Sequence, residues 1–260
     1  MAAAIIGGLL RQHWTTASIH AVDVLPEARA KLTTDFGITT SEDALTVAAQ
    51  AQTIVLAVKP QQMHSVTTAL RSVINNQLVI SIAAGLRGAD LQRWLGPNAR
   101  VVRAMPNTPA LIGAGLSGLF AMPGVDSAQK HTAEQILAAV GTTFWVNTEI
   151  ELDAVTAVSG SGPAYVFYFI EALEQAALEL GLSPALARHS ALSTFSGAVQ
   201  LAQSSPDSPA ELRARVTSKG GTTERALSIL NADHVQATIR RAVQGAAQRA
   251  AELGDDLSRP

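Results

Sequence analysis

Short apolar runs alternate with helix-like segments through the first 146 residues, and this alternation limits the possible folds more than any other feature. Residues 53–58 and 78–82 are almost continuous apolar runs, which is typical of strands buried on both faces. Helix-like segments separate such runs, and parallel strands need crossovers of this kind. The pattern predicts a parallel sheet that is covered by helices on both faces.

The same periodicity gives the bounds of each expected element. The expected strands are residues 18–22, 37–39, 53–58, 78–82, 100–104, 116–121 and 143–146. The expected helices between them are residues 2–13, 26–36, 41–49, 61–72, 89–95 and 127–140. Pro26 suits a helix start because its missing N–H has no partner there, and Ser41 is the expected cap of the helix that follows it.

From about residue 150 the strand signal disappears. The expected helices are residues 151–158, 164–180, 184–203, 209–216, 224–230 and 234–253. The sequence therefore predicts an α/β domain over residues 1–148 and an all-helical domain over residues 149–260. Helices this rich in Ala and Leu are hard to bury within one small domain, so a homodimer through the helical half is expected.

Composition excludes several classes of function. Of 260 residues, 47% are hydrophobic and 15% are charged, which is typical of a well-buried globular protein. The formal net charge of -2 predicts no basic surface for nucleic acid or an anionic membrane. The sequence has no cysteine and no apolar run of membrane-spanning length, which excludes disulfides and fits a cytoplasmic protein.

Residues 216–223 read Val-Thr-Ser-Lys-Gly-Gly-Thr-Thr and stand immediately before a helix-like segment. Glycine lets backbone approach a ligand closely. A helix start offers unpaired N–H groups and a partial positive charge. Together these features predict a site for a small anion such as a carboxylate or phosphate. The alternative is an ordinary glycine turn with Ser or Thr as the helix cap, and the stretch alone does not decide.

Polar residues follow several of the expected strands. Asp23 follows the first one, and in dinucleotide-binding folds an acid there accepts hydrogen bonds from the adenosine ribose. A turn-starting Asp is the alternative. Lys59 either meets a cofactor phosphate or lies in solvent. The stretch 103–109, Arg-Ala-Met-Pro-Asn-Thr-Pro, is either a rigid binding turn or a plain loop.

Conventional catalytic groupings do not occur in the sequence. Residues 159–165, Ser-Gly-Ser-Gly-Pro-Ala-Tyr, lack the strand–turn–helix setting of a nucleophile elbow. They indicate a closely packed break between helices, or a loop against a ligand. No two of the six histidines share a helix face at i, i+4, so no metal site is predicted.

Taken in order, the motifs resemble the signatures of the pyrroline-5-carboxylate reductase family. They are residues 57–60, 81–85, 103–109, 159–165 and 216–223. The resemblance implies a Rossmann-like nicotinamide-dinucleotide domain and a helical domain that interleaves with a partner subunit. It also implies reduction of 1-pyrroline-5-carboxylate to L-proline with NADPH or NADH, the last step of proline biosynthesis. A protonated cyclic imine carries its own positive charge, so hydride addition requires orientation rather than a metal or a nucleophile.

The resemblance also implies roles for individual residues. The substrate carboxylate would be held by Ser218, Gly220, Gly221, Thr222 and Thr223. Thr223 would orient the imine or relay its proton, and Glu149 would lie near the substrate. The cofactor side would be lined by Ala57, Val58, Lys59, Pro60, Ile82, Ala83, Ala84, Met105, Pro106 and Asn107, with Asp23 at the adenosine end.

The chain departs from the family pattern in two places. Val24 follows Asp23 where relatives often have a basic residue, and an acid without a neighbouring cation favours NADH over NADPH. Met1-Ala2-Ala3 resembles the end of the family's Gly-x-Gly loop, so the first strand and the leading glycines are missing. We therefore expect a gap in the sheet and weaker binding of the pyrophosphate. One hypothesis is that Met1 is an internal methionine of a longer protein.

Two alternative functions are also compatible with the sequence. One is another imine-reducing or β-hydroxyacid-type NAD(P) dehydrogenase. The helix after Pro163 has no lysine of the kind such enzymes use, which counts against that alternative. The other is a shortened, non-catalytic dimeric relative.

Overall fold

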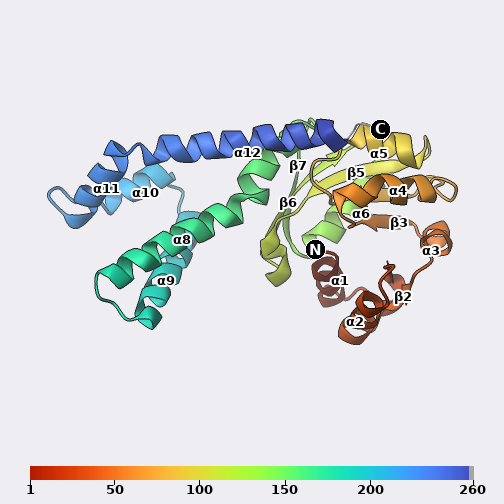
Figure 1. Ribbon diagram of the computed structural model, residues 1–260, viewed down its shortest axis with the longest axis horizontal. Helices are drawn as coiled ribbons and strands as arrows, with labels where there is room; N and C mark the ends of the chain where they lie inside the picture. The colour runs from red at the N-terminus through yellow and green to blue at the C-terminus, as the bar shows by residue number, and fades with distance from the viewer. Residues whose placement is uncertain (258–260) are drawn as a thin grey trace. The chain divides into compact units, whose positions relative to one another are not determined.

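The computed structural model describes residues 1–257 and divides them into two compact units (Figure 1). Unit 1 contains residues 1–161 together with the C-terminal segment that begins at residue 245, and unit 2 contains residues 162–244. The sequence placed the division between residues 148 and 149 and assigned the whole C-terminal helix to the helical part. By its contacts, the end of that helix instead belongs to the α/β unit.

A five-stranded sheet forms the centre of unit 1, in the order β3-β4-β5-β6-β7. The strands are β3 (Thr53–Leu56), β4 (Leu78–Ser81), β5 (Arg100–Met105), β6 (Gly115–Ala121) and β7 (Gly141–Trp145). Strands β3, β4 and β5 are parallel, but β6 pairs antiparallel with β5, and β7 runs parallel to β6. The expectation of a wholly parallel sheet is therefore wrong at β6. The connection from β5 holds only the 3₁₀ turn η2 (Thr108–Ile112), and a parallel return needs a longer crossover.

Two further strands form a separate parallel pair, β1 (His20–Val22) with β2 (Thr39–Ser41). The 3₁₀ turn η1 (Thr16–Ser18) precedes them. Among the described residues β1 and β3 do not pair with each other, and Figure 1 shows β2 apart from β3. This break is the gap in the sheet that the sequence predicted.

Alternate side chains of the central strands enter different cores. Leu78 and Ile80 of β4 join one cluster, whereas Val79 between them joins the other, as the two-residue period of a strand requires. The first cluster contains residues of α1 and α6, and the second contains residues of α4 and α5 (Figure 1). Helices therefore cover both faces, as predicted.

The helices of unit 1 begin close to their predicted positions. They are α1 (Ala2–Arg11), α2 (Pro26–Phe36), α3 (Ala44–Gln50), α4 (Pro60–Leu70), α5 (Gly88–Leu95), α6 (Ser127–Ala138) and α7 (Glu151–Val155). The predicted cap of α3 was wrong: Asp43, not Ser41, accepts hydrogen bonds from Leu45 N and Thr46 N. Ser41 ends β2, because that strand lies two residues beyond its predicted start.

Unit 2 is entirely helical in the part of the chain described. Its helices are α8 (Gly162–Glu179), α9 (Pro184–Ser204), α10 (Pro209–Arg215), α11 (Thr222–Ala232) and the first part of α12 (Val235–Leu257). Ser183 and Ser208 cap α9 and α10. Helix α8 packs against α9, yet α8 has no buried residue, and apolar side chains such as Phe167 and Leu201 are exposed. The single chain therefore leaves apolar surface uncovered in this unit.

Candidate active site

Three of the predicted cofactor segments meet at one edge of the sheet in unit 1. Residues 57–60 follow β3, residues 82–84 follow β4, and residues 105–107 include the end of β5 and the start of the next turn. Because these three strands are parallel, their carboxyl ends lie side by side. This edge is where open α/β sheets bind their ligands.

The β3–α4 connection presents both backbone and a cation. Lys59 precedes α4 in an extended conformation and Pro60 is its first residue, so the helix starts without a side-chain cap. Ala57 and Lys59 are exposed, and Val58 is half-buried. The segment can contact a ligand through backbone groups and through the Lys59 ammonium.

The turn after β5 is braced by its own asparagine. Asn107 Nδ2 donates to Ser159 O at 3.1 Å, and Asn107 Oδ1 accepts from Leu116 N at 2.9 Å. The 5-residue π-helical segment η3 (Thr156–Gly160) contains Ser159. A Cβ atom on Gly160 would lie 2.6 Å from Met105 Cε. These contacts favour close packing as the role of the Ser-Gly-Ser-Gly motif.

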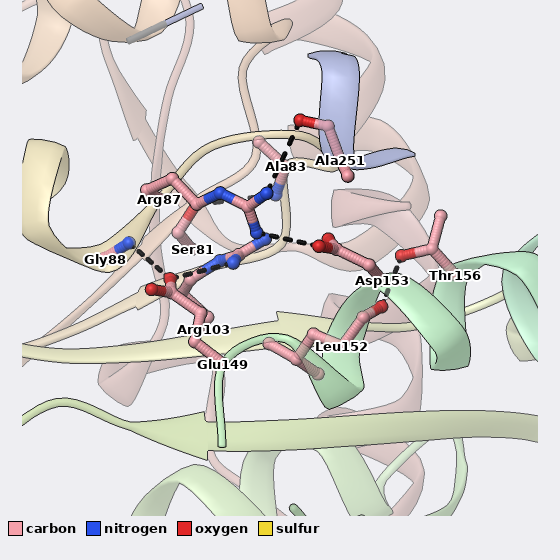
Figure 2. A network of polar contacts seen from close by, with 10 residues as sticks. All are labelled: Ser81, Ala83, Arg87, Gly88, Arg103, Glu149, Leu152, Asp153, Thr156 and Ala251. Atoms are coloured by element: carbon pink, nitrogen blue, oxygen red, sulfur yellow. Dashed lines mark hydrogen bonds and ion pairs between the residues drawn. The ribbon is translucent and has the colours of Figure 1, made fainter. Parts of the chain in front are cut away.

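An ion-pair network that the sequence did not predict lies behind the β4–α5 loop (Figure 2). Glu149 Oε1 accepts from Arg103 Nη1 at 2.8 Å and from Gly88 N at 2.5 Å. The Arg103 side chain is 6% exposed and that of Glu149 is 21% exposed. Arg87 pairs in turn with Asp153 at 2.9 Å. The sequence of β5 held one signal: Arg103 lies among the apolar residues of a strand whose centre is buried.

Glu149 acts as a remote cap for α5. The residue before this helix is Arg87, whose side chain caps nothing, although Ser, Thr, Asp and Asn are the usual caps. The Glu149 carboxylate takes that place at Gly88 N. The residue expected near the substrate thus holds a helix start and a buried guanidinium in the isolated chain.

Asp23 directly follows β1, as the sequence predicted, and its side chain makes the turn that was the alternative to ribose binding. Its Oδ1 accepts from Leu25 N at 2.9 Å, which makes the expected turn. Arg29 Nη1 donates to the Asp23 carbonyl at 2.8 Å, and Arg29 also pairs with Glu42 at 3.2 Å. The assumption that Asp23 has no neighbouring cation was therefore wrong. Val24, the next residue, carries no charge, but the first turns of α2 bring Arg29 back to Asp23.

The predicted carboxylate cradle forms a turn at the start of α11 in unit 2. Gly220 has φ +75°, a left-handed conformation that favours glycine, and Gly221 precedes the helix. Gly221 N donates to Ser218 O at 3.1 Å. Gly220 N donates to Glu224 Oε2 at 2.7 Å, so a carboxylate already binds a backbone N–H of this turn. Gly221 is the residue before α11, and no Ser or Thr side chain caps this helix.

Comparisons with known proteins give matches in both parts of the chain. Residues 149–253 match the family model described as pyrroline-5-carboxylate reductase dimerisation, and residues 1–85 match a model described as NADP oxidoreductase, coenzyme F420-dependent. The pyrroline-5-carboxylate reductase of Pseudomonas aeruginosa is 47% identical over 258 residues, which are 99% of this chain and 94% of that protein. The chain belongs to the pyrroline-5-carboxylate reductase family.

Solved structures of this family share the fold. A pyrroline-5-carboxylate reductase from Coxiella burnetii has a TM-score of 0.91 and 38% identity, covering 97% of this chain and 94% of that one. The Plasmodium falciparum pyrroline carboxylate reductase with NADP bound has a TM-score of 0.88 and 28% identity over 97% of this chain and 94% of its own. The predicted family and the predicted fold, a Rossmann-like sheet domain followed by a helical domain, are both confirmed.

Two further observations concern metal ligands and membrane-spanning helices. Among residues 1–257, no three or more His, Asp or Glu side chains form a group that could hold a metal ion. None of the helices in this range is long and apolar enough to cross a membrane.

Proposed function

We propose that the chain reduces 1-pyrroline-5-carboxylate to L-proline with a nicotinamide dinucleotide, the last step of proline biosynthesis. One observation carries this proposal: 47% identity to a pyrroline-5-carboxylate reductase over 99% of the chain. The order of the five motifs supports it independently. The competing proposal of a different imine-reducing or β-hydroxyacid-type dehydrogenase has no such support.

The reaction needs little from the protein besides position and charge. The imine nitrogen of the substrate is protonated, and the bound dinucleotide supplies a hydride to the imine carbon. The C=N double bond becomes a single bond, and its electron pair stays on nitrogen as a secondary amine. The protein therefore has to hold the carboxylate, orient the ring and exclude water.

The turn before α11 is proposed to hold the substrate carboxylate. The proposed contacts are Ser218, Gly220, Gly221, Thr222 and Thr223. The Glu224 carboxylate on Gly220 N, at 2.7 Å, supports this because it has the same chemistry as the substrate anion. Thr223 is half-buried, one residue inside the helix, and is proposed to orient the imine nitrogen through its hydroxyl.

Glu149 is proposed to lie near the substrate as well as to cap α5. The partial exposure of its side chain, 21%, leaves room for this second contact. In the isolated chain one oxygen, Oε1, makes both contacts, to Arg103 and to Gly88.

The strand-end loops of unit 1 are proposed to line the nicotinamide side. They contribute Ala57 to Pro60, Ile82 to Ala84 and Met105 to Asn107. The residues fit a dinucleotide because three parallel strands end there and the first turn of α1 has no acidic side chain to repel a phosphate. Because Asn107 uses both ends of its amide as a brace, its ligand contacts would come from backbone.

The dinucleotide is proposed to be NADH in preference to NADPH, although the family model is described as an NADP oxidoreductase. Asp23 repels a 2′-phosphate, and Arg29 beside it is already paired with Glu42. The chain is further proposed to work as a cytoplasmic homodimer through its helical half, which matches the dimerisation model.

The break between β1 and β3 favours one competing proposal, a non-catalytic dimeric relative. One assay separates the two: oxidation of NADH and of NADPH followed at increasing concentrations of pyrroline-5-carboxylate, with the substrate left out as a blank. Substrate-dependent oxidation supports the reductase. No oxidation, together with no calorimetric binding of either dinucleotide, would support the non-catalytic relative.

Thr223→Ala tests the residue placed nearest the imine. Loss of a group that positions a proton typically slows the reaction by about 10²-fold, so kcat should fall by roughly that factor. Ser228→Ala on the same helix is the matched control, because Ser228 Oγ bonds only its own helix, at Arg225 O. Equal kcat values for the two variants would remove Thr223 from the site.

A further inference from the structure

Three parts of unit 1 that are distant in the sequence meet at the β4–α5 loop. They are the loop together with the first residue of α5 (residues 82–88), helix α7 and the last turns of α12 (Figure 2). The loop carries Ile82, Ala83 and Ala84, which are proposed to contact the nicotinamide. The contacts that hold this loop in place therefore affect how the cofactor is positioned.

Arg87 connects the three parts. Its Nη1 donates to Asp153 Oδ2 on α7 at 2.9 Å, and its Nη2 donates to the carbonyl of Ala251 on α12 at 3.4 Å. The Arg87 side chain is 22% exposed and that of Asp153 is 11% exposed. A guanidinium suits this place because its fork of donors can reach two acceptors at once.

Two glycines bring the loop and α12 into contact. A Cβ atom on Gly254 would lie 2.7 Å from Arg87 Nε, so the guanidinium rests directly on the backbone of α12. A Cβ atom on Gly85 would lie 3.0 Å from Leu253 Cβ, and Gly85 has φ +72°. Larger residues at either place would separate α12 from the loop.

The residue after Arg87 is fixed on its other side. Gly88 N donates to Glu149 Oε1, and the same oxygen pairs with Arg103 of β5. Consecutive residues of the loop are thus tied to two carboxylates, Glu149 just before α7 and Asp153 within it. Loop movement would break both ties and leave partly buried charges without partners, which opposes it.

We propose that Arg87 is a positioning residue that holds the β4–α5 loop against α7 and the end of α12, so that the loop presents a fixed surface to the nicotinamide ring. This inference rests on the proposed reductase function. It gives the end of the last helix, which contains none of the proposed ligand-contact residues, a part in holding the cofactor site.

Hydrogen exchange and steady-state kinetics on the full chain test the proposal together. In Arg87→Ala, amide exchange in peptides covering residues 82–88 and 249–257 should rise at least about tenfold, because local opening becomes easier. The KM for NADH should rise about tenfold while kcat changes by less than about threefold. This pattern is expected when the lost interaction stabilises the ground state and the transition state equally. Arg87→Lys keeps the charge opposite Asp153 and should restore most of the KM.

Arg249→Ala is the matched control, since it removes an arginine from the same stretch of α12 whose side chain is 58% exposed. It should change neither exchange in the loop nor the KM. A merely structural role would reduce the amount of active enzyme, and so kcat, with KM unchanged. Should Arg87→Ala not fold, as judged by circular dichroism, Asp153→Asn, which keeps the shape of the side chain, takes its place.

Unchanged exchange in residues 82–88 of the folded variant would overturn the proposal, whatever the activity. If the unaltered chain shows no reductase activity, the proposed function fails, and the exchange measurement still decides whether Arg87 holds the loop.

Discussion

At the scale of single residues, Asp23, Arg29 and Glu42 form a chain of contacts at the end of β1 that bears on the choice between NADH and NADPH. Arg29 would suit a 2′-phosphate, but Glu42 pairs with it, and Asp23 keeps a negative charge at the turn. The Glu42 side chain is 75% exposed, so the ion pair is screened and weak. Because the Arg29–Glu42 ion pair is weak, a single substitution should be enough to change the choice of cofactor.

Glu42→Gln and Asp23→Ser should both move the preference toward NADPH. Freeing Arg29 should raise the ratio of kcat/KM for NADPH over NADH about threefold, and removing the acid should raise it about tenfold, or about 1.4 kcal/mol. Calorimetry with adenosine 2′,5′-bisphosphate gives a second measurement that does not need catalysis. Asp35→Asn is the control, since Asp35 pairs with Lys31 on the exposed face of α2. A ratio that falls in Asp23→Ser would contradict this assignment.

At the scale of elements, the cap of α3 should make that helix sensitive to acid. The Thr46 hydroxyl, together with the Thr46 and Leu45 amides, holds the pKa of Asp43 below its usual value. A lowered pKa in the folded state means that the carboxylate stabilises α3 above the ordinary Asp pKa. That contribution is lost as the pH falls through the lowered value.

Backbone amide shifts of Leu45 and Thr46, followed by NMR between about pH 2 and 6, should therefore titrate below the ordinary Asp pKa. The same amides should show no such step in Asp43→Asn, where the cap cannot ionise. A step at or above the ordinary value in the unaltered chain would show that the cap does not stabilise the carboxylate.

Helix α1 depends on a glycine that helix propensity alone would replace. A Cβ on Gly8 would lie 2.3 Å from Ala139 O, at the end of α6, and backbone there cannot easily move. Alanine gains about 1 kcal/mol in helix propensity, whereas overpacking costs about 1–3 kcal/mol or more. Gly8→Ala should therefore lower the free energy of unfolding, by about 1–2 kcal/mol.

Calorimetric melting measures this effect as a drop in Tm of a few degrees. Gly245→Ala on α12 is the matched control, because a Cβ there meets nothing within 4 Å. It should keep or raise the Tm. If Gly8→Ala raises the Tm as well, α1 does not pack as closely on α6 as its geometry indicates.

The elements that the sequence predicted well are those with local causes. Helix α2 begins at Pro26 and ends before Gly37, which has φ +65°, and both signals are written in neighbouring residues. The ends of the three strands that precede the cofactor segments were predicted from apolar runs and the turn residues after them. The contacts that could not be predicted depend on partners far along the chain: the cap of α5 by Glu149, and the Arg87–Asp153 pair, separated by 66 residues.

At the scale of the whole molecule, the two predicted halves of the site belong to different units. The strand-end loops lie in unit 1 and the Gly220–Gly221 turn in unit 2. One group of motifs follows strands and the other precedes a helix. The motifs did not predict that α12 would leave unit 2 at residue 245 and end in unit 1, since helical periodicity is the same along its length.

The exposed apolar surface of unit 2 predicts a stable homodimer. Helix α8 has no buried residue, and its aromatic side chains Phe167 and Tyr168 are 64% and 71% exposed. Large exposed apolar patches of this kind mark interaction surfaces. Covering one Phe contributes about 1.5–3 kcal/mol, and in a two-fold dimer each site counts twice. Phe167→Glu should therefore weaken the dimer by roughly 3–6 kcal/mol, or about 10²- to 10⁴-fold in Kd. Sedimentation equilibrium at micromolar concentration should show dimer for the unaltered chain and monomer for the variant. Glu174→Gln on the same helix should stay dimeric, and a monomeric unaltered chain would mean that something other than a second copy covers this surface.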